Sequence, residues 1–246
     1  MNETIQTLTN HRSIRKYKDQ PLTEEQLAVI LESIRRAPTS INGQQVSVIV
    51  VQNKERKKKL AAYTGNQVWV DEAPVFLVLC SDFYRAKLAA EKQGVPLKIT
   101  DSVESLIVGA TDVGIALGNA MASAESMGLG VVPIGGIRRN PHEVIELLNL
   151  PEYVIPVVGL ALGHPDQDPG LKPRFNKEAI CHHETYNKDL RPFIDEYDEE
   201  IKAYIKERTN GKEQRTWSET IMQYYRFVYY PEVLSMLQKQ GYGLDE

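Results

Sequence analysis

The 246-residue sequence lacks the features that mark several large protein classes. It has two cysteines, Cys80 and Cys181, which are too few for a disulfide-stapled scaffold or a cysteine-rich zinc module. The 29 basic residues do not outnumber the 33 acidic ones, and the net charge of −4 argues against binding to nucleic acid through its phosphates. The N-terminus has no basic-then-apolar secretory signal. We therefore expect a cytoplasmic protein.

The sequence also has no long hydrophobic run free of polar residues. Residues 103–127 form the most apolar long stretch, but four polar side chains fall within it: Glu104, Asp112, Asn119 and Glu125. We therefore predict a helix of the protein interior and no membrane span. Because small and apolar residues occur all round this helix, we expect it to be enclosed on every side, by the core and by a subunit interface. Three glycines would let neighbouring backbones approach it: Gly109, Gly114 and Gly118.

Hydrophobic patterning predicts strands and helices in an irregular order. β-branched runs predict strands at 46–51, 75–79, 131–132 and 154–162. Helices are predicted at 4–8, from a Thr23/Gln26 capping box to about residue 37, and at 54–62, 103–127, 189–207, 217–230 and 231–240. The Lys/Arg cluster of 54–62 is interpreted as a solvated helix face. Because there is no regular βαβ alternation, we predict a three-layer α+β domain.

The composition changes after residue 163. A Pro/Asp-rich loop covers 164–173, and a charged helix and a tyrosine-rich segment follow it. We predict one domain over residues 1–246 with a helical C-terminal excursion from about 185 to 246. The excursion has few aliphatic residues, so we expect it to pack on another surface.

Motifs for common active sites are missing. In Gly128-Leu129-Gly130, the third glycine of a dinucleotide-binding fingerprint would fall on Pro133, and the glycines precede the strand that they should follow. There is no phosphate-binding loop of nucleotide hydrolases, no nucleophile elbow and no zinc-protease motif. Cys181-His182-His183 has no second ligand group nearby, so we expect a surface loop there and no metal site. This inventory favours a protein that binds an anionic cofactor and leaves the chemistry to it.

Three short features are suited to such binding, each with a simpler interpretation beside it. His11-Arg12-Ser13-Ile14-Arg15 would place His11, Ser13 and Arg15 on one face of an extended segment, where they can hold an anion. Lys172-Pro173-Arg174 adds two cations, or is only a solvated loop. Pro133–Gly136 lets a flat ring approach the backbone, or is only a turn. The polar stretch 39–45 supplies uncharged donors, or only connects a helix to a strand.

Taken in order along nearly the whole chain, these features resemble the flavin-dependent nitroreductase family, in particular its NADPH-linked oxygen-insensitive nitroreductases and flavin reductases. The matching segments are 11–15, 65–67, 124–130, 134–136, 159–163, 171–174, 216–218 and 239–241. The resemblance implies a three-layer α-β-α fold with a mixed central sheet, and an intertwined homodimer with FMN bound non-covalently at each of two interface sites.

The resemblance also implies roles for individual residues. The expected cofactor-binding set is His11, Arg12, Ser13, Arg15, Thr39, Ser40, Gln44, Gln67, Ile134, Gly135, Gly136, Lys172 and Arg174. Within it, His11, Ser13, Lys172 and Arg174 would grip the phosphate, and Gln67 would bond the pyrimidine side of the ring. Arg15 and Gly135 would tune the flavin, because a cation near N1 and O2 stabilises the negative charge that reduction creates. Pro38, Ile41 and Asn42 depart from the serine-rich loop of the family.

The resemblance implies NADPH as the reductant, with some use of NADH. Arg208 matches one position at which the family holds the NADPH 2′-phosphate. Lys212 and Arg215 flank the next position that has this role in the family. Hydride would pass from NADPH to FMN and then to a flavin, a quinone or a nitroaromatic compound, by ping-pong kinetics. The alternatives are a non-catalytic FMN-binding protein and a relative that reduces azo, disulfide or chromate acceptors. Neither nucleic acid nor a membrane is an expected partner.

Overall fold

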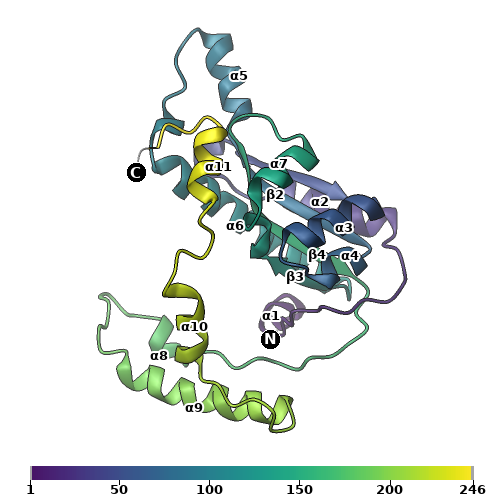
Figure 1. The fold of residues 1–246 in the computed structure, drawn as a ribbon, viewed down its shortest axis with the longest axis vertical. Coiled ribbons are helices and arrows are strands. Elements are labelled where there is room, and N and C mark those ends of the chain that lie inside the picture. The colour runs from purple at the N-terminus through teal and green to yellow at the C-terminus, as the bar shows by residue number, and fades with distance from the viewer. Residues whose placement is uncertain (1, 245–246) are drawn as a thin grey trace. The chain divides into compact units, whose positions relative to one another are not determined.

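The computed structural model describes residues 2–244 and divides into two compact units. The first unit comprises Met1–Pro169 together with Tyr230–Glu246, and the second is Gly170–Tyr229 (Figure 1). The chain therefore leaves the first unit at residue 170 and returns at 230, whereas the predicted excursion runs from about 185 to the end. The single domain with an excursion at 185–246 stays a prediction.

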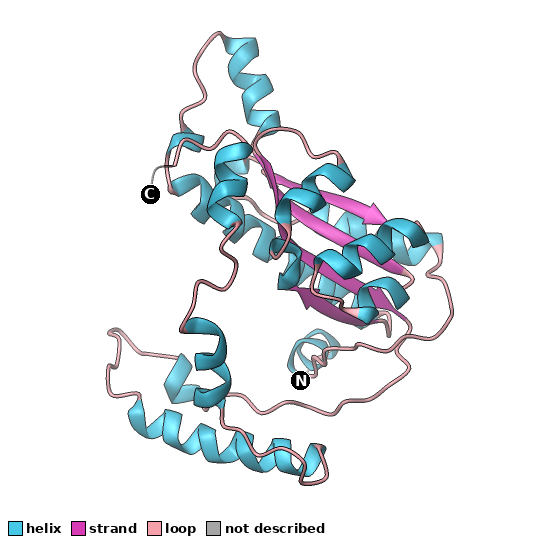
Figure 2. Ribbon diagram, viewed as in Figure 1, coloured by secondary structure: helices cyan, strands magenta, loops and turns pink. Residues whose placement is uncertain are grey.

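A four-stranded sheet in the order β1-β2-β4-β3 lies at the centre of the first unit (Figure 2). Its strands are β1 (Val46–Val51), β2 (Val75–Asp82), β3 (Gly130–Ile134) and β4 (Val154–Gly163). All four occur at the predicted positions, three of them longer than predicted. Every ladder is antiparallel. The parallel component of the expected mixed sheet is a single bridge between Ser13 and Val131, along the outer edge of β3.

Helices cover both faces of this sheet. The helices of the first unit are α1 (Glu3–Thr9), α2 (Glu24–Arg35), α3 (Lys54–Tyr63), α4 (Val68–Glu72), α5 (Tyr84–Gln93), α6 (Glu104–Ser126), α7 (Pro141–Leu148) and α11 (Val233–Lys239), with 3₁₀ turns at η1 (Ser40–Asn42), η2 (Ile99–Asp101) and η3 (Gly135–Arg138). The predicted capping box of α2 is present, with Thr23 and Gln26 each bonding the other's backbone N–H. The α+β class and the three layers are confirmed.

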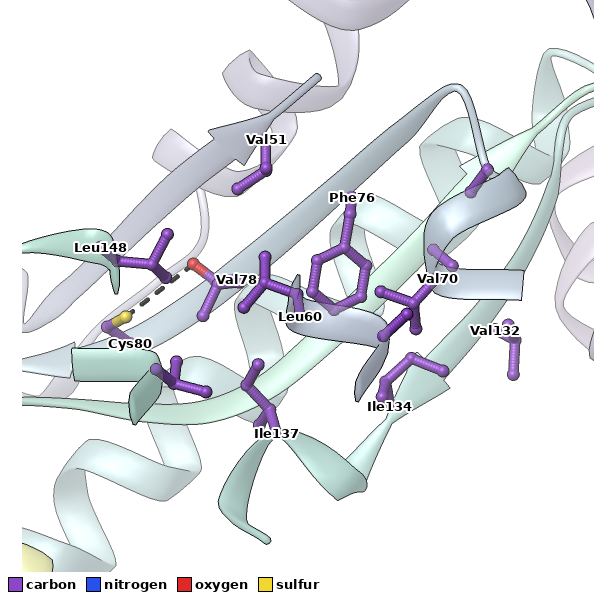
Figure 3. Close-up of a cluster of buried hydrophobic side chains, with 14 of the residues drawn as sticks. Val51, Leu60, Val70, Phe76, Val78, Cys80, Val132, Ile134, Ile137 and Leu148 are labelled. Carbon is purple, nitrogen blue, oxygen red and sulfur yellow. Dashed lines mark hydrogen bonds between the residues drawn. The ribbon is translucent and has the colours of Figure 1, made fainter. Parts of the chain in front are cut away.

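The alternation of side chains along β2 divides the core into two clusters. Phe76, Val78 and Cys80 face α3, α4 and α7 (Figure 3), whereas Val75 and Leu77 face α2 and α6. All eight residues of β2 are buried, because helices cover this strand on both faces. The site residues described below are therefore positioned around a sheet whose second strand is packed on both faces.

The long helix α6 is covered by its own chain on one side only, and the subunit interface expected on the other side stays a prediction. Gly109 is buried against β2, where a Cβ atom would lie 2.1 Å from Ser81 Oγ, so this glycine does permit a close approach. Gly114 and Gly118 have open space around them, and α6 is not enclosed on that side within one chain. In the described part of the chain, α6 is the one helix long and apolar enough to cross a membrane. Its buried face packs on the sheet like that of a core helix.

In the basic helix α3, one residue differs from the expected solvated face. Lys57, interpreted as part of a solvated face, is buried. Its Nζ donates to the carbonyl oxygens of Asp71 (3.0 Å) and Ala73 (2.5 Å), at the C-terminal end of α4. Burial lowers the pKa of this ammonium group. Lys57 therefore caps α4 and fixes the helix that follows Gln67.

The second unit is helical. It contains α8 (Lys177–Ile180), α9 (Arg191–Arg208) and α10 (Trp217–Tyr225), and the predicted helices at 189–207 and 217–230 are confirmed, the latter ending earlier. Phe175, Tyr197 and Trp217 pack together, with ring centroids 4.1–6.3 Å apart. This aromatic cluster supplies the apolar contact that the few aliphatic residues do not.

The two cysteines should differ sharply in reactivity. Cys80 lies in the core, where burial raises the pKa of its thiol to about 12, whereas Cys181 is exposed. Because the thiolate is the reactive form, we expect Ellman's reagent to modify one thiol per folded chain and two after unfolding. In a Cys181→Ser variant the folded protein should not react. A fast reaction of that variant would contradict the buried placement of Cys80.

Candidate functional site

The N-terminal pentad adds an extended segment to the edge of the sheet. The Ile14 N–H donates to the Val131 carbonyl at 2.9 Å. A Cβ atom on Gly130 would lie 2.7–2.8 Å from the Ile14 side chain, so glycine at 130 lets the segment approach this closely. Ile14 is buried, and His11 Nε2 lies 3.4 Å from Ser13 Oγ. The structure thus brings His11 and Ser13 together, as the predicted alternation requires.

His11 is held by Glu125, which lies in the matching segment 124–130 but was assigned no role from the sequence. The carboxylate of Glu125, in the last turn of α6, lies 2.6 Å from His11 Nδ1, and both side chains are largely buried. An acidic residue at the C-terminal end of a helix opposes the helix dipole. That unfavourable position is the one sequence signal that points to a cationic or hydrogen-donating partner for Glu125.

Arg12 extends in another direction from the segment. Its guanidinium donates to both carboxylate oxygens of Asp168, at 2.9 and 3.0 Å. These two residues line a cavity of about 680 Å³ beside α1, together with Ile14, Glu125 and others. Among the described residues, Arg12 is the one member of the predicted cofactor-binding set that lines this cavity.

The predicted ring-binding residues of the first unit form a connected cluster. The Arg15 guanidinium lies 5.6 Å from the ring centroid of Trp69. Gln67 Nε2 donates to the Thr64 carbonyl at 2.7 Å, and a Cβ atom on Gly136 would lie 2.5 Å from both atoms of this bond. Gln67 and Gly136, which are far apart in the sequence, are therefore in contact, and Arg15 meets Trp69, two residues after Gln67 in α4.

The placement of Gln67 depends on the turn before it. Gly65 and Asn66 both have positive φ, at 94° and 59°. Glycine and asparagine are the residues that adopt this backbone most readily, so the sequence Gly-Asn is suited to the turn. The Gln67 N–H then donates to Ala61 at 3.1 Å, which ties the turn to α3.

Two further side chains lie beside Gly135, and no sequence motif indicated them. A Cβ atom on Gly135 would find Arg138 Nη2 at 3.5 Å and the Tyr230 hydroxyl at 3.9 Å, both ordinary contacts. Arg138 stacks on the Tyr230 ring at 5.4 Å and donates to the Val157 carbonyl. Gly135, where β3 meets η3, therefore has room for one further methyl group, beside the side chains of Arg138 and Tyr230.

The polar loop before β1 adopts a strained backbone. Ile41, Asn42 and Gln44 have positive φ of 48°, 56° and 52°. Such values cost energy for residues with a Cβ and persist only where the surroundings hold them. Ile41 is 97% exposed at the tip of the loop.

Buried and charged groups hold this loop in place. The Ser40 N–H donates to both carboxylate oxygens of the buried Asp112, at 3.2 and 3.3 Å, and Thr39 Oγ1 accepts from the Gln44 N–H at 3.1 Å. Arg85 donates to the Gln44 carbonyl at 2.5 Å and to Asp82 at 2.8 Å. The predicted residues Thr39, Ser40 and Gln44 thus belong to one fixed loop.

The second unit carries the other predicted basic residues. Lys172 and Arg174 precede Phe175 of the aromatic cluster and are exposed. Arg208, at the end of α9, donates to the Tyr204 hydroxyl at 2.9 Å. Arg215 lies 3.4 Å from Glu213, and Lys212 is exposed nearby in the same turn. Convergence of Lys172 and Arg174 with His11 and Ser13 remains a prediction.

Comparison with known proteins gives matches over the full length. Residues 8–164 match the nitroreductase family and residues 172–245 match the nitroreductase family C-terminal domain. The FMN reductase [NAD(P)H] of Bacillus subtilis (strain 168) is 54% identical over 249 residues, which cover 100% of each chain. The solved structure of B. megaterium NfrA2 has a TM-score of 0.98 at 54% identity, again with full coverage.

A more distant solved structure agrees. The NADPH:FMN oxidoreductase from Vibrio harveyi, complexed with NAD⁺, has a TM-score of 0.88 at 37% identity and covers 98% of each chain. The two family matches together span both units, and the relatives align with this chain from end to end. Every part of the fold therefore has a counterpart in them. The chain therefore belongs to the nitroreductase family.

Proposed function

We propose that this protein is an FMN-dependent NAD(P)H oxidoreductase, a flavin reductase and nitroreductase. This proposal rests on the end-to-end similarity to an FMN reductase at 54% identity. The contacts of Arg15, Gln67 and Gly136 support it. The names of the Bacillus subtilis and Vibrio harveyi relatives give FMN together with NAD(P)H or NADPH, and the proposal extends that activity to this chain.

The residues present fit a flavin mononucleotide. The predicted set consists of hydrogen-bond donors: imidazole, hydroxyl, guanidinium, ammonium and amide groups, as an anionic phosphate and a polar ring edge require. The uncrowded backbone at Gly135, where a Cβ atom would meet nothing closer than 3.5 Å, leaves space for a flat ring. Bound there, FMN supplies hydride transfer from a nicotinamide to an acceptor.

The protein's own residues divide the work of binding and tuning. His11, Ser13, Lys172 and Arg174 would hold the phosphate, and Arg12 would lie on the neighbouring side of the segment. Arg15 would place a positive charge near the pyrimidine edge and so make the flavin easier to reduce. Trp69, which packs against Arg15, would restrict where that charge sits. Ile134, Gly135 and Gly136 would present backbone to the ring, and Gln67 would bond its pyrimidine side.

The homodimer is part of the proposal. Along α6, exposed small and apolar residues recur at i, i+3, i+4, i+7, i+8 and i+11: Ile107, Ala110, Thr111, Gly114, Ile115 and Gly118. We call this set the α6 stripe. A contiguous apolar face of this kind marks an interaction site. A second copy covers it in our proposal, and the rigid loop holding Thr39, Ser40 and Gln44 then contributes to the partner's cofactor site.

The function is tested with the purified protein. Its absorbance spectrum should show bound flavin, and anaerobic NADPH should bleach the flavin bands. Addition of free FMN or a nitroaromatic compound should restore them, and steady-state initial-rate lines should be parallel. A yellow protein that NADPH does not bleach would instead identify a non-catalytic FMN-binding protein. The cytoplasm stays the predicted compartment.

Arg208→Ala should affect the two reductants differently. We propose that Arg208, oriented by Tyr204, binds the 2′-phosphate of NADPH with Lys212 and Arg215 beside it. The KM for NADPH should rise by about tenfold, equivalent to a loss of about 1.4 kcal/mol. The KM for NADH should change by less than twofold. Arg191→Ala, at the other end of α9, is the matched control. Equal changes for both coenzymes would refute the assignment.

A further inference from the structure

The pair formed by Glu125 and His11 carries an inference that rests on the proposed function. The carboxylate approaches Nδ1 to 2.6 Å, and the side chains of His11 and Glu125 are 23% and 14% exposed. The residues are 114 positions apart, so the pairing is a product of the fold. An ionised carboxylate only accepts, and the hydrogen between them is therefore assigned to Nδ1.

With Nδ1 occupied, the other ring nitrogen faces Ser13. His11 Nε2 lies 3.4 Å from Ser13 Oγ, which places the two predicted phosphate-binding side chains next to each other. An imidazole can otherwise rotate about its side-chain bonds and turn either nitrogen outward. The bond to Glu125 removes that freedom and fixes the plane of the ring.

We propose that Glu125 is a positioning residue of the phosphate grip: it accepts from Nδ1–H of His11 and orients the ring so that, with both ring nitrogens carrying hydrogen, Nε2–H and the Ser13 hydroxyl donate to the phosphate of the bound flavin mononucleotide. Glu125 itself does not touch the phosphate. Carboxylates that orient ligating histidines in metal sites typically contribute 10–100-fold to affinity, and the same geometry here applies to an anion.

The arrangement also has an opposing electrostatic consequence. Glu125 is negative, and so is the phosphate, so an unscreened carboxylate would weaken FMN binding. The proposal requires that the gain from orienting His11 exceed this repulsion. If the orientation of His11 dominates, removal of the Glu125 charge weakens FMN binding. If the repulsion dominates, the same change strengthens FMN binding, so a single substitution distinguishes the two.

The experiment compares two flavins on full-length protein from which the cofactor has been removed. Riboflavin has the same ring and ribityl chain as FMN but no phosphate, so it reports every contact except the phosphate grip. Glu125→Gln should raise the Kd for FMN by about tenfold or more and leave that for riboflavin within about twofold. Glu104→Gln, at the exposed start of the same helix, is the matched control and should change neither value.

A double-mutant cycle shows whether Glu125 acts through His11. In a His11→Gln background, Glu125→Gln should no longer weaken FMN binding, because the group that it orients is gone and only the repulsion of the phosphate is removed. Equal weakening of FMN and riboflavin by Glu125→Gln alone, tighter FMN binding by that single variant, or additive effects in the cycle would each overturn the proposal.

A measurement without flavin separates this inference from the proposed function. Long-range ¹H–¹⁵N spectra should show a hydrogen-bonded Nδ1–H on His11 that is lost in Glu125→Leu, with His11→Gln providing the assignment. If wild-type protein does not distinguish FMN from riboflavin, the phosphate grip is wrong and the proposal with it. If it does distinguish them, but His11 Nδ1 carries no hydrogen, only the role of Glu125 is overturned.

Discussion

Replacement of Gly136 by alanine should lower the free energy of unfolding by about 1–3 kcal/mol, as expected when atoms are forced into a packed site. The new Cβ would lie 2.5 Å from the Thr64 carbonyl oxygen and 2.5 Å from Gln67 Nε2. The carbonyl belongs to the backbone at the end of α3 and does not move easily. Both the stability of the turn and the position of Gln67 should therefore change, which thermal unfolding and FMN titration would measure.

The neighbouring glycine is the control for this variant. A Cβ atom on Gly135 would meet only ordinary contacts, at 3.5 and 3.9 Å, so Gly135→Ala should leave the free energy of unfolding within about 0.5 kcal/mol of wild type. If both variants were equally stable, the close packing of Gly136 against Gln67 would be refuted. Because the two substitutions add the same methyl group to adjacent residues, the comparison isolates the local packing.

Substitution of the α6 stripe should have an even larger effect on assembly. Ile107→Arg and Ile115→Arg place charges on a face that the proposed dimer buries, and an unpaired buried charge costs about 3 kcal/mol or more. We expect the dimer dissociation constant to rise by more than about 100-fold. Because both side chains are exposed within one chain, the subunit should still fold. Analytical ultracentrifugation and circular dichroism would measure the two properties.

The control for the stripe retains its apolar character. Ile107→Met and Ile115→Met should stay dimeric, since shape changes at an apolar contact are tolerated better than charge. The monomeric Arg variants should also lose FMN if the loop at 39–44 contributes to the partner's site. A protein that remains dimeric with both arginines would show that the subunits meet through another surface.

Local sequence patterns predicted most of the fold. The Thr23/Gln26 capping box and the β-branched runs of β1, β2 and β4 depend on residues within a few positions of one another, so the periodicity carries them. From the same patterns we interpreted Lys57 as solvated. This was wrong because the group that buries Lys57 lies on α4, outside the local pattern. The stripe containing Gly114 and Gly118 was interpreted as enclosed, because composition does not distinguish burial in one chain from burial between two.

The candidate site divides in the same way. The donor types, their spacing in residues 11–15 and the family resemblance came from the sequence, and so did the expectation that Arg15, Gln67 and Gly136 share a site. Within the first unit the structure brings Gln67 and Gly136 into contact and places Arg15 against Trp69 of the next helix, and their sharing of one cofactor site stays a prediction. Asp112 under Ser40 and Arg138 beside Gly135 were not predicted, since no local pattern relates a residue to a partner far along the chain.

The amino-acid order by itself determined the α+β class, the positions of the strands and of most helices, and the donor groups of the pentad, because periodicity and side-chain type are local properties. Tertiary structure alone decided which buried charged groups meet: Glu125 with His11 and Lys57 with the end of α4. The physical reason is that a buried charge must find a partner, and only the packing of the helices against the sheet fixes which one lies within reach.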